Sequence, residues 1–334
     1  MTKEASNRIY WIRFICAMMV VGIHSENGIV FQLPADSMSL KIQAWIANNI
    51  YCVAVPIFFI LSGFFCFYHK DEKQIMEKYR SRILKTAYLY LLWNMIYMCY
   101  HYLKEIVAEG GRISINPVDI FKGIFLYEYN NPWWFMLQLL LLEVMTPVFL
   151  YAMRNKKNGF IVLLLCLAIS LIADINGISN PYIRLDALAW YAFGIYAGRY
   201  MDQLLLQEEK RKWTPWLCIL LGEIALYASM RGGDNRIRCL PILVLAVGFF
   251  KICEHIEKTI PKIWKETFFM YAIHPLLLGI LQQMEAKIIT VKGWISLLLF
   301  VLNPFAVILI ISVIVWLIGK TRIYHILVAE SKRG

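Results

Sequence analysis

Charged residues are scarce in this sequence of 334 residues. Asp, Glu, Lys and Arg together make up 17% of the chain, whereas hydrophobic residues make up 60%. Soluble domains contain about 45–50% apolar residues, so this composition excludes an ordinary soluble globular domain. The shortage of charge favours a protein whose solvent is a lipid bilayer.

Paired cysteine motifs, internal repeats and low-complexity tracts are also missing. The eight cysteines stand singly in or beside apolar runs, and none forms a CxxC pair. This spacing excludes a zinc ribbon or a dithiol redox motif, and we expect no metal and no tightly bound cofactor. A disulfide between Cys52 and Cys239 stays open, because sequence alone does not fix cysteine geometry.

Long apolar runs fill the chain instead. Runs of about 18–24 residues recur from end to end, and each is long enough to cross about 30 Å of hydrocarbon as a helix. We therefore predict an all-α, polytopic integral membrane helix bundle, one membrane domain over residues 1–334 with no appended soluble domain. The ten predicted spans lie near residues 9–30, 44–68, 84–103, 133–153, 159–175, 185–201, 214–231, 237–253, 266–284 and 294–319.

The positive charge is distributed unevenly between the loops. The net charge is +11, and 24 of the 34 Lys and Arg residues fall in the segments that share a side with the N-terminus. Because Lys and Arg concentrate on the cytoplasmic side of membrane proteins, this pattern predicts that both termini are cytoplasmic. It accounts for the basic balance without a nucleic-acid partner. The first run is long, contains Arg13 and His24 and lacks a clear cleavage site, so we predict a retained helix rather than a signal peptide.

Two connecting segments carry further information. The long connection 104–132 contains a short apolar stretch, 120–127, which predicts an interfacial helix ahead of Trp133 and Trp134 at headgroup level. On the opposite side, residues 69–85 read HKDEKQIMEKYRSRILK. Ordinary positive-inside charge explains this stretch, but Arg82 and Lys85 lie one helical turn apart and could together bind a polyphosphate.

The first run holds two ionisable residues that are costly inside a membrane. Arg13 and His24 are eleven residues apart, which places both on one helix face, about 16 Å apart along the axis. A neutral histidine can act as a general base, and an arginine can hold an anionic phosphate or carboxylate. The alternative is structural: Arg13 reaches to lipid phosphate, and His24 hydrogen-bonds to a neighbouring helix.

Five phrases in order resemble one known family. Arg13, ten residues and then His24 within RFICAMMVVGIHS look like the opening signature of the acyltransferase family 3 membrane proteins. The later phrases are VPIFFILSGFF at 55–65 with Ser62-Gly63, the Arg82 to Lys85 pair followed by Trp93, WWFMLQLLLLEVMTP at 133–147, and FFMYAIHP at 268–275.

The resemblance implies an enzyme that transfers an acyl group, typically acetyl from acetyl-CoA, to a hydroxyl of a cell-surface glycan or envelope polymer. His24 would then be the general base, and Arg13 would bind the donor or stabilise charge on it. Arg80, Arg82 and Lys85 would bind the acyl-CoA phosphates. No Ser or Cys has an evident base beside it, so we expect direct transfer rather than a covalent intermediate.

Other polar residues in or near the runs have alternative roles. Glu143 either accepts a hydrogen bond from the His24 ring or pairs with an arginine. His274, which precedes Pro275, either bonds within a kinked helix or contacts substrate. The remaining candidates for the acceptor site, or for support around the catalytic residues, are Ser62, Trp134, Arg184 and Asp186, the last two being equally consistent with a local salt bridge; Glu223 is expected to be structural.

Two other classes of function compete with the acyltransferase. The membrane portion of the vancomycin-type serine racemases belongs to the same family and has been regarded as a serine transporter. The resemblance therefore leaves open a transporter of serine, of another small polar solute or of a glycan. Broken helices and inverted repeats, which would support a transporter, are not evident in the sequence. A scaffold would not explain the charged stripe of the first helix. We expect acyl-CoA, a hydroxyl acceptor and membrane lipid as partners, in a multi-pass protein of a bacterial plasma (inner) membrane, whose oligomeric state stays open.

Overall fold

The computed structural model describes residues 1–108, 116–178, 180–206, 211–230 and 237–330, and this part of the chain is helical with no strand. Its α-helices are α1 (Lys3–His24), α2 (Met38–Trp45), α3 (Ala54–Phe67), α4 (Glu72–Ala108), α5 (Pro117–Phe125), α6 (Trp134–Val144), α7 (Thr146–Ala152), α8 (Lys156–Ile175), α9 (Leu185–Tyr200), α10 (Asp202–Leu206), α11 (Thr214–Met230), α12 (Cys239–Cys253), α13 (Thr267–Ile288), α14 (Trp294–Ile318) and α15 (Arg322–Val328). Short turns of other helix types are η1 (Ile46–Ile50), η2 (Tyr51–Val53), η3 (Asn131–Trp133) and η4 (Lys262–Lys265).

The first helix begins earlier and ends earlier than the run 9–30 predicts. Thr2 caps α1 by accepting a hydrogen bond from the Ala5 amide at 3.1 Å, and the helix ends at His24. Ser25 terminates it, because its hydroxyl bonds back to the Val21 carbonyl at 2.8 Å. His24 therefore lies in the last turn of α1, and Arg13 lies near its middle.

Helical structure is found at every other predicted run, with two differences in continuity. Residues Met38–Phe67 form one 30-residue helical segment, in which η1 and η2 connect α2 to α3 without a break. The run 133–153 is bent by 49° between α6 and α7. Pro147 explains the bend, since it lacks the amide that would continue the hydrogen-bond ladder of α6.

Several helices have the length and composition of membrane spans. In the described residues, the segments Met38–Phe67, α8 and α14 each suffice to cross a bilayer, and the bent pair α6–α7 provides a fourth. Shorter apolar helices cover Thr214–Ser229 and Cys239–Cys253. The chain is therefore an all-helical membrane protein, while ten crossings and cytoplasmic termini stay predictions.

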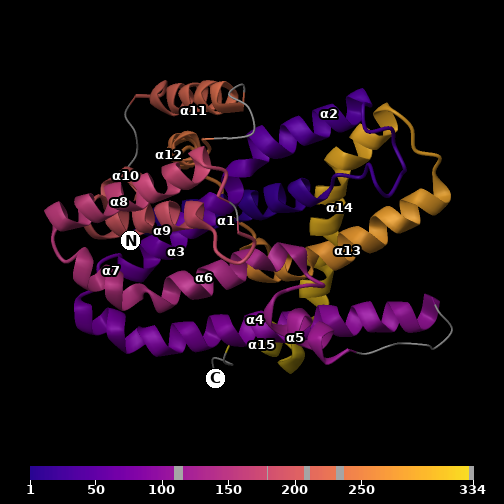
Figure 1. Cartoon of the computed structure of the whole chain (residues 1–334), viewed down its shortest axis with the longest axis horizontal. Coiled ribbons are helices and arrows are strands. Elements are labelled where there is room, and N and C mark those ends of the chain that lie inside the picture. Colours follow the sequence, from indigo (N-terminus) through magenta and orange to yellow (C-terminus); the bar gives the residue numbers. More distant parts are fainter. Residues whose placement is uncertain (109–115, 179, 207–210, 231–236, 331–334) are drawn as a thin grey trace.

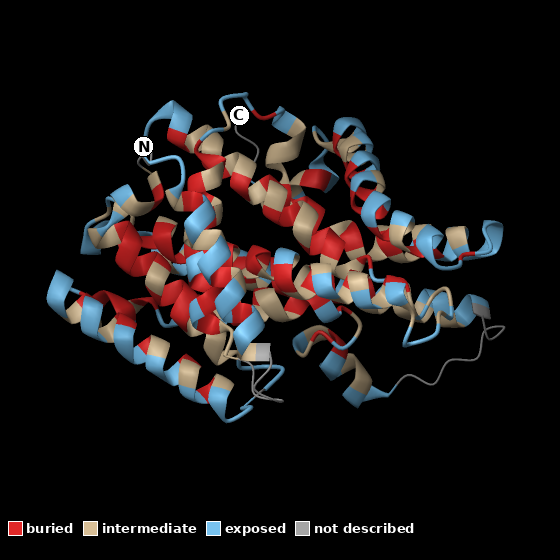
Figure 2. Ribbon diagram, turned by 90° about the horizontal axis from the view of Figure 1, so that it is seen from above, coloured by how far each residue is buried: buried red, intermediate tan, exposed pale blue. Residues whose placement is uncertain are grey.

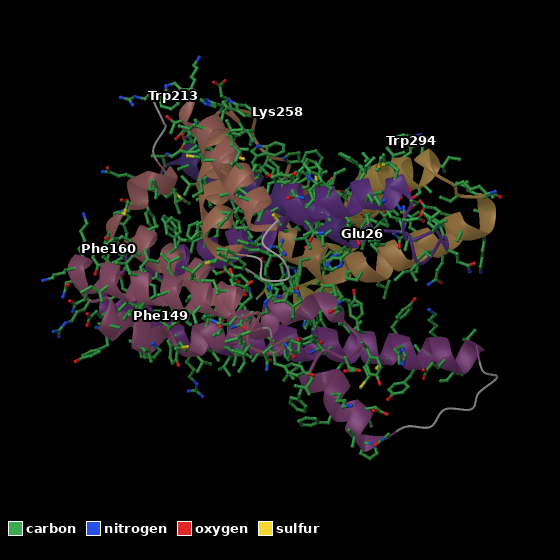
Figure 3. The ribbon with its side chains drawn as sticks, turned by 45° about the horizontal axis from the view of Figure 1, so that its top comes forward. Glu26, Phe149, Phe160, Trp213, Lys258 and Trp294 are labelled. Carbon is green, nitrogen blue, oxygen red and sulfur yellow. The ribbon has the colours of Figure 1, made fainter. Side chains whose placement is uncertain are left out.

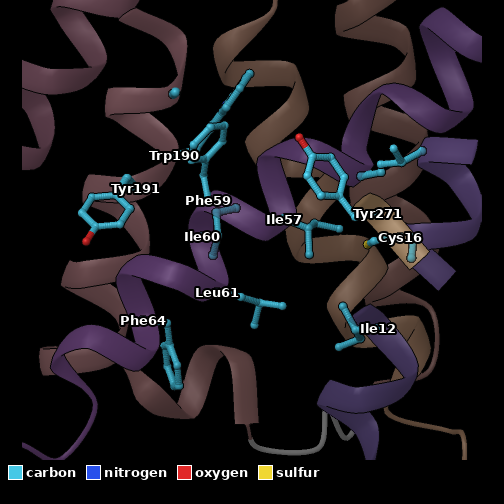
Figure 4. Packing of buried hydrophobic residues seen from close by; sticks show 14 of the residues in the cluster. Ile12, Cys16, Ile57, Phe59, Ile60, Leu61, Phe64, Trp190, Tyr191 and Tyr271 are labelled. Carbon is cyan, nitrogen blue, oxygen red and sulfur yellow. The ribbon is translucent and has the colours of Figure 1, made fainter. Parts of the chain in front are cut away.

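Helices α3 and α9 cross the middle of the molecule and pack tightly on each other (Figure 1). A Cβ added at Gly194 would lie 2.1 Å from the Ile60 carbonyl oxygen, and one at Gly63 would lie 2.3 Å from that of Tyr191. Small residues of this kind let membrane helices approach backbone to backbone. Beside this contact, Phe59 of α3 lies next to Trp190 of α9, with ring centroids 6.3 Å apart (Figure 4).

The outer surface is strongly apolar. Buried residues concentrate in the interior, whereas the peripheral helices expose many large side chains (Figure 2). Phe160, Trp213 and Trp294 lie on the outside in Figure 3, with exposed fractions of 49%, 57% and 72%. Helix α11 packs mainly on α12 and leaves Trp216 and Leu220 uncovered. Extensive apolar exposure of this kind is expected where lipid covers the protein.

Contacts join basic segments that charge counting assigns to one side. Asn7 and Trp11 of α1 donate side-chain hydrogen bonds to the Lys258 carbonyl at 3.0 and 2.6 Å. His69 lies 3.2 Å from Asp202, which joins the 69–85 segment to the 199–212 segment. These contacts agree with the predicted grouping of the loops. The short helix predicted in the long connection is found as α5, while its place at the membrane interface stays a prediction. All eight cysteines are free, so the Cys52–Cys239 disulfide is not formed.

Residues 109–115 of the long connection lie outside the described part of the chain.

Candidate active site

A cavity of about 310 Å³ opens between α1, α3, α4, α6 and α13. It brings together Arg13, Arg82 and Lys85, which the sequence predicts to bind the donor, and Ser62, a predicted candidate for the acceptor site or for support around the catalytic residues. We call this space the basic cavity. The rest of its wall is apolar and includes Val20, Phe58, Leu61, Phe135 and Tyr271. The basic cavity therefore combines positively charged side chains with an apolar wall.

Arg82 is fixed in place by two partners. Its Nε donates to Glu143 Oε1 at 2.7 Å, and its Nη2 donates to the Ser62 carbonyl at 2.9 Å. Glu143 is buried, with a side chain only 4% exposed. Of the two roles predicted for Glu143, pairing with an arginine is confirmed, and the hydrogen bond to His24 is not formed. The carboxylate compensates the guanidinium and holds it at the wall of the cavity.

Arg13 and Lys85 are held less firmly. Among the described residues, neither side chain has a hydrogen bond or an ion pair. Arg13 is half-buried and Lys85 is exposed, and both line the basic cavity. Two positive charges without a hydrogen bond or an ion pair in the described residues leave this cavity suited to an anion.

The basic region continues past Arg82. A neighbouring cavity of about 340 Å³ is lined by Lys70, Lys78, Arg82 and Glu143 among others. Lys70 donates to the Phe65 carbonyl at 2.5 Å, at the C-terminal end of α3, so Lys78 and Arg82 carry the charge available to a ligand. Arg80 is exposed and lines neither cavity, so its predicted donor contact gains no support from this arrangement.

His24 and His274 form a close pair. Their ring centroids are 5.3 Å apart, although the residues are 250 positions apart in the chain. Val20 and Tyr271 line the basic cavity, and each histidine follows one of them by about one helical turn. Neither histidine is among the residues that line the basic cavity, and the pair lies about one helical turn beyond Val20 and Tyr271 of its wall. Sequence reasoning named both histidines but gave no reason to bring them together.

A second, larger cavity has a volume of about 530 Å³, and we call it the polar cavity. Ile23 and Val55 line it, and Val55 also lines the basic cavity. The predicted acceptor candidates Trp134, Arg184 and Asp186 all belong to its wall. Val55 is thus common to both walls, and Ile23, the residue before His24, lines the polar cavity.

Two arginines, Arg184 and Arg238, and two aspartates, Asp174 and Asp186, line the polar cavity, so its formal charges balance. Arg184 pairs with Asp186 at 2.6 Å, which confirms the predicted local salt bridge, and its guanidinium lies 4.5 Å from the Trp134 ring centroid. Asp174 accepts backbone hydrogen bonds from Arg238 and Cys239 at 2.9 and 3.1 Å.

Sequence reasoning missed Asp174 and Arg238 as part of a site. The sequence did contain a signal that could have identified them, because both are charged residues at the ends of predicted spans.

Two remaining predictions concern support and metals. His274 Nδ1 lies 2.7 Å from the Tyr271 carbonyl, which confirms the expected bond within a kinked helix. Glu223 is half-buried on α11 and does not line either cavity. Within the described ranges, no group of three His, Cys, Asp or Glu side chains is placed to hold a metal ion.

Comparison with known proteins adds a family and one relative. A family model for an acyltransferase domain, Acyl_transf_3, matches residues 7–318. A glycerol-3-phosphate acyltransferase of Malacoplasma penetrans (strain HF-2) is 30% identical over 101 residues, which cover 28% of this chain and 35% of that protein. The chain thus matches about a third of the length of this curated relative. No solved structure matches.

Proposed function

Because the chain belongs to acyltransferase family 3, we propose that this membrane acyltransferase moves an acyl group, typically acetyl, from acyl-CoA to a hydroxyl of a cell-surface glycan or envelope polymer. The basic cavity would hold the donor, and the polar cavity would hold the acceptor. His24, between the two, would act as the general base. The proposal includes ten spans and cytoplasmic termini in a bacterial plasma membrane.

One observation carries the donor assignment. Arg13, Arg82 and Lys85, from two different helices, line one cavity whose remaining wall is apolar. An acyl-CoA presents phosphates at one end and a thioester at the other end of a long arm. Cations engage the phosphates through charge-assisted hydrogen bonds, and the apolar wall excludes water from the thioester.

The length of α1 separates two roles. Eleven residues of helix place Arg13 about 16 Å from His24, too far for both to touch the same reacting carbon. Arg13 therefore binds the donor, in this proposal, and does not stabilise the oxyanion. Holding donor and acceptor on either side of His24 converts a bimolecular attack into an oriented one.

The proposed reaction proceeds in one displacement through a tetrahedral intermediate. His24 removes the proton from the acceptor hydroxyl while the oxygen attacks the thioester carbonyl carbon. The carbon–sulfur bond then breaks, an ester bond has formed, and the imidazolium returns the proton to the departing CoA thiolate. No oxidant, reductant or metal is needed for this balance.

The polar cavity supports a hydroxylated acceptor. Its lining holds two arginines and two aspartates, so the formal charges balance and a neutral polyol leaves no net charge to be compensated. The relative from Malacoplasma penetrans is named for glycerol-3-phosphate. Glycerol-3-phosphate is therefore a second acceptor to test beside envelope glycans.

Purified protein in lipid vesicles with labelled acetyl-CoA tests the proposal. The acceptors are an envelope glycan extract and, separately, glycerol-3-phosphate. Wild type is compared with His24→Ala and with His101→Ala, a matched change at a half-exposed histidine of α4. We expect His24→Ala to lower the transfer rate by about 10²–10⁴-fold, the usual range for a general base, and His101→Ala to leave it unchanged.

Equal labelling by wild type and His24→Ala would rule out His24 as the base. The competing transporter function has its own readout: movement of labelled serine across the same vesicles without any acyl transfer would replace the enzyme proposal.

A further inference from the structure

The hydrogen-bond ladder of α13 is interrupted beside the active-site histidines. Pro275 lies inside this helix and has no amide hydrogen. In an unbroken helix, that amide would donate to the carbonyl four residues earlier, which belongs to Tyr271. The Tyr271 carbonyl thus loses its helical donor as a direct consequence of the His-Pro sequence.

His274 supplies the missing donor. Its Nδ1 lies 2.7 Å from the Tyr271 carbonyl oxygen. A carbonyl oxygen only accepts hydrogen bonds, so Nδ1 must carry the proton. The next step of the ladder is bridged by Tyr97, whose hydroxyl donates to the Ala272 carbonyl at 3.0 Å and accepts from the Leu276 amide at 3.3 Å. The break in α13 is therefore fully hydrogen-bonded.

The proton on Nδ1 also determines the state of Nε2, the other nitrogen of the neutral His274 ring. With its proton on Nδ1, neutral His274 presents a lone pair at Nε2, which can only accept. His274 is fully buried, and among the described residues its Nε2 has no hydrogen-bond partner. A buried acceptor without a donor is unusual and calls for an explanation.

The neighbouring ring is that of His24. The two centroids are 5.3 Å apart at an interplanar angle of 38°. No hydrogen bond joins the two rings in the described structure. Each imidazole nitrogen lies about 1 Å from its ring centroid, so a turn of the rings that points a His24 nitrogen at His274 Nε2 would bring the two atoms to about 3 Å, a normal hydrogen-bond length. Among the described residues, His24 has no hydrogen bond of its own.

We propose that His274 is a positioning residue whose Nε2 accepts a hydrogen bond from one ring nitrogen of His24. His24 then keeps its proton on that nitrogen and presents the lone pair of the other nitrogen to the acceptor hydroxyl. Pro275, by freeing the Tyr271 carbonyl, sets the direction of this two-histidine chain. The catalytic part of this inference rests on the proposed function, because it assigns a tautomer to the proposed base.

The alternative is that His274 only repairs the helix break. The two explanations use different nitrogens, and two amide substitutions separate them. In His274→Asn, the short side chain places its amide near the position of Nδ1 and can still donate to Tyr271. In His274→Gln, the longer side chain places its amide near the position of Nε2 and can accept from His24.

Transfer assays on folded proteins in lipid provide the first readout. We expect His274→Gln to keep kcat within about tenfold of wild type, whereas His274→Asn and His274→Ala lower it by about 10–100-fold, with KM for acyl-CoA unchanged, as is typical when a partner that orients an active-site ring is removed. Activity of His274→Asn equal to or above that of His274→Gln would overturn the positioning role. Equal loss in all three variants would overturn it as well.

The second readout does not depend on acyl transfer. Nitrogen-15 NMR of labelled histidine, assigned with His24→Gln, reports which His24 nitrogen carries the proton. We expect one tautomer in wild type and in His274→Gln, and a mixture in His274→Asn. The same tautomer ratio in all three proteins would overturn the inference. If wild type transfers no acyl group, the proposed function fails, while these spectra still decide whether His274 orders the His24 ring.

Discussion

The basic and polar cavities differ in their balance of charge. Three cations, Arg13, Arg82 and Lys85, and no carboxylate line the basic cavity, and Arg82 alone has an ion pair among the described residues. In the polar cavity, two arginines face two aspartates, and Arg184 pairs with Asp186. An excess of cations attracts an anionic ligand, whereas balanced charges favour a neutral, hydroxylated one. In the proposed function, this difference assigns the donor to the basic cavity and the acceptor to the polar cavity.

The largest effect should come from removing positive charge from the basic cavity. We expect Arg82→Ala combined with Lys85→Ala to raise the apparent KM for acyl-CoA by about 100-fold, since hydrogen bonds to charged groups contribute about 1.5–3 kcal/mol each. The KM for the acceptor should not change. Steady-state kinetics in lipid measures both constants.

Arg154→Ala is the control for this pair, since it removes a cation of the α7–α8 turn that stacks on Tyr151 away from both cavities. An unchanged donor KM in the double variant would exclude these two residues from the donor site.

A bulkier residue at Val55 should hinder the meeting of the two substrates. Val55 lines both of them, so Val55→Phe inserts side-chain volume at their common wall. We expect kcat to fall by about tenfold or more, because small displacements of reacting groups are costly, with both KM values raised. A change in only one KM would mean that the two substrates do not meet at this wall.

The smallest effect should be at the polar cavity. Arg184→Gln breaks an ion pair that is only partly buried, and such pairs contribute about 0–1 kcal/mol. We expect the acceptor KM to rise by about two- to fivefold, with donor KM unchanged, in an acceptor titration at saturating acyl-CoA. A rise in donor KM instead would reverse the assignment of the cavities.

The sequence predicted most elements of the fold because long apolar runs have few alternatives to a membrane helix. Helical structure is found at all ten runs, and the run at 294–319 matches α14 to within a residue. Helix ends were less predictable: Ser25 ends α1 through its own side-chain bond, and Pro147 bends the run 133–153. Such ends depend on local hydrogen bonds that hydropathy does not record.

The site was only partly predictable. Arg13, Arg82 and Lys85 were expected to act together, and they line one cavity. The partner of Glu143 could not be chosen, because a carboxylate in a helix can reach an arginine or a histidine, and only packing of α4 on α6 selects Arg82. Asp174 and Arg238 went unnoticed because each looks like an ordinary charge at a helix end.

By itself, the sequence determined the solvent of this protein, the family, and the placing of Arg13 and His24 on one helix face, since composition, ordered phrases and helical period are properties of the chain alone. The tertiary structure decided which residues from distant segments meet. It paired His24 with His274 and Arg82 with Glu143, and it formed two cavities with different charge. Contacts of this kind depend on how the helices pack, and helix packing depends on close approaches such as that at Gly194.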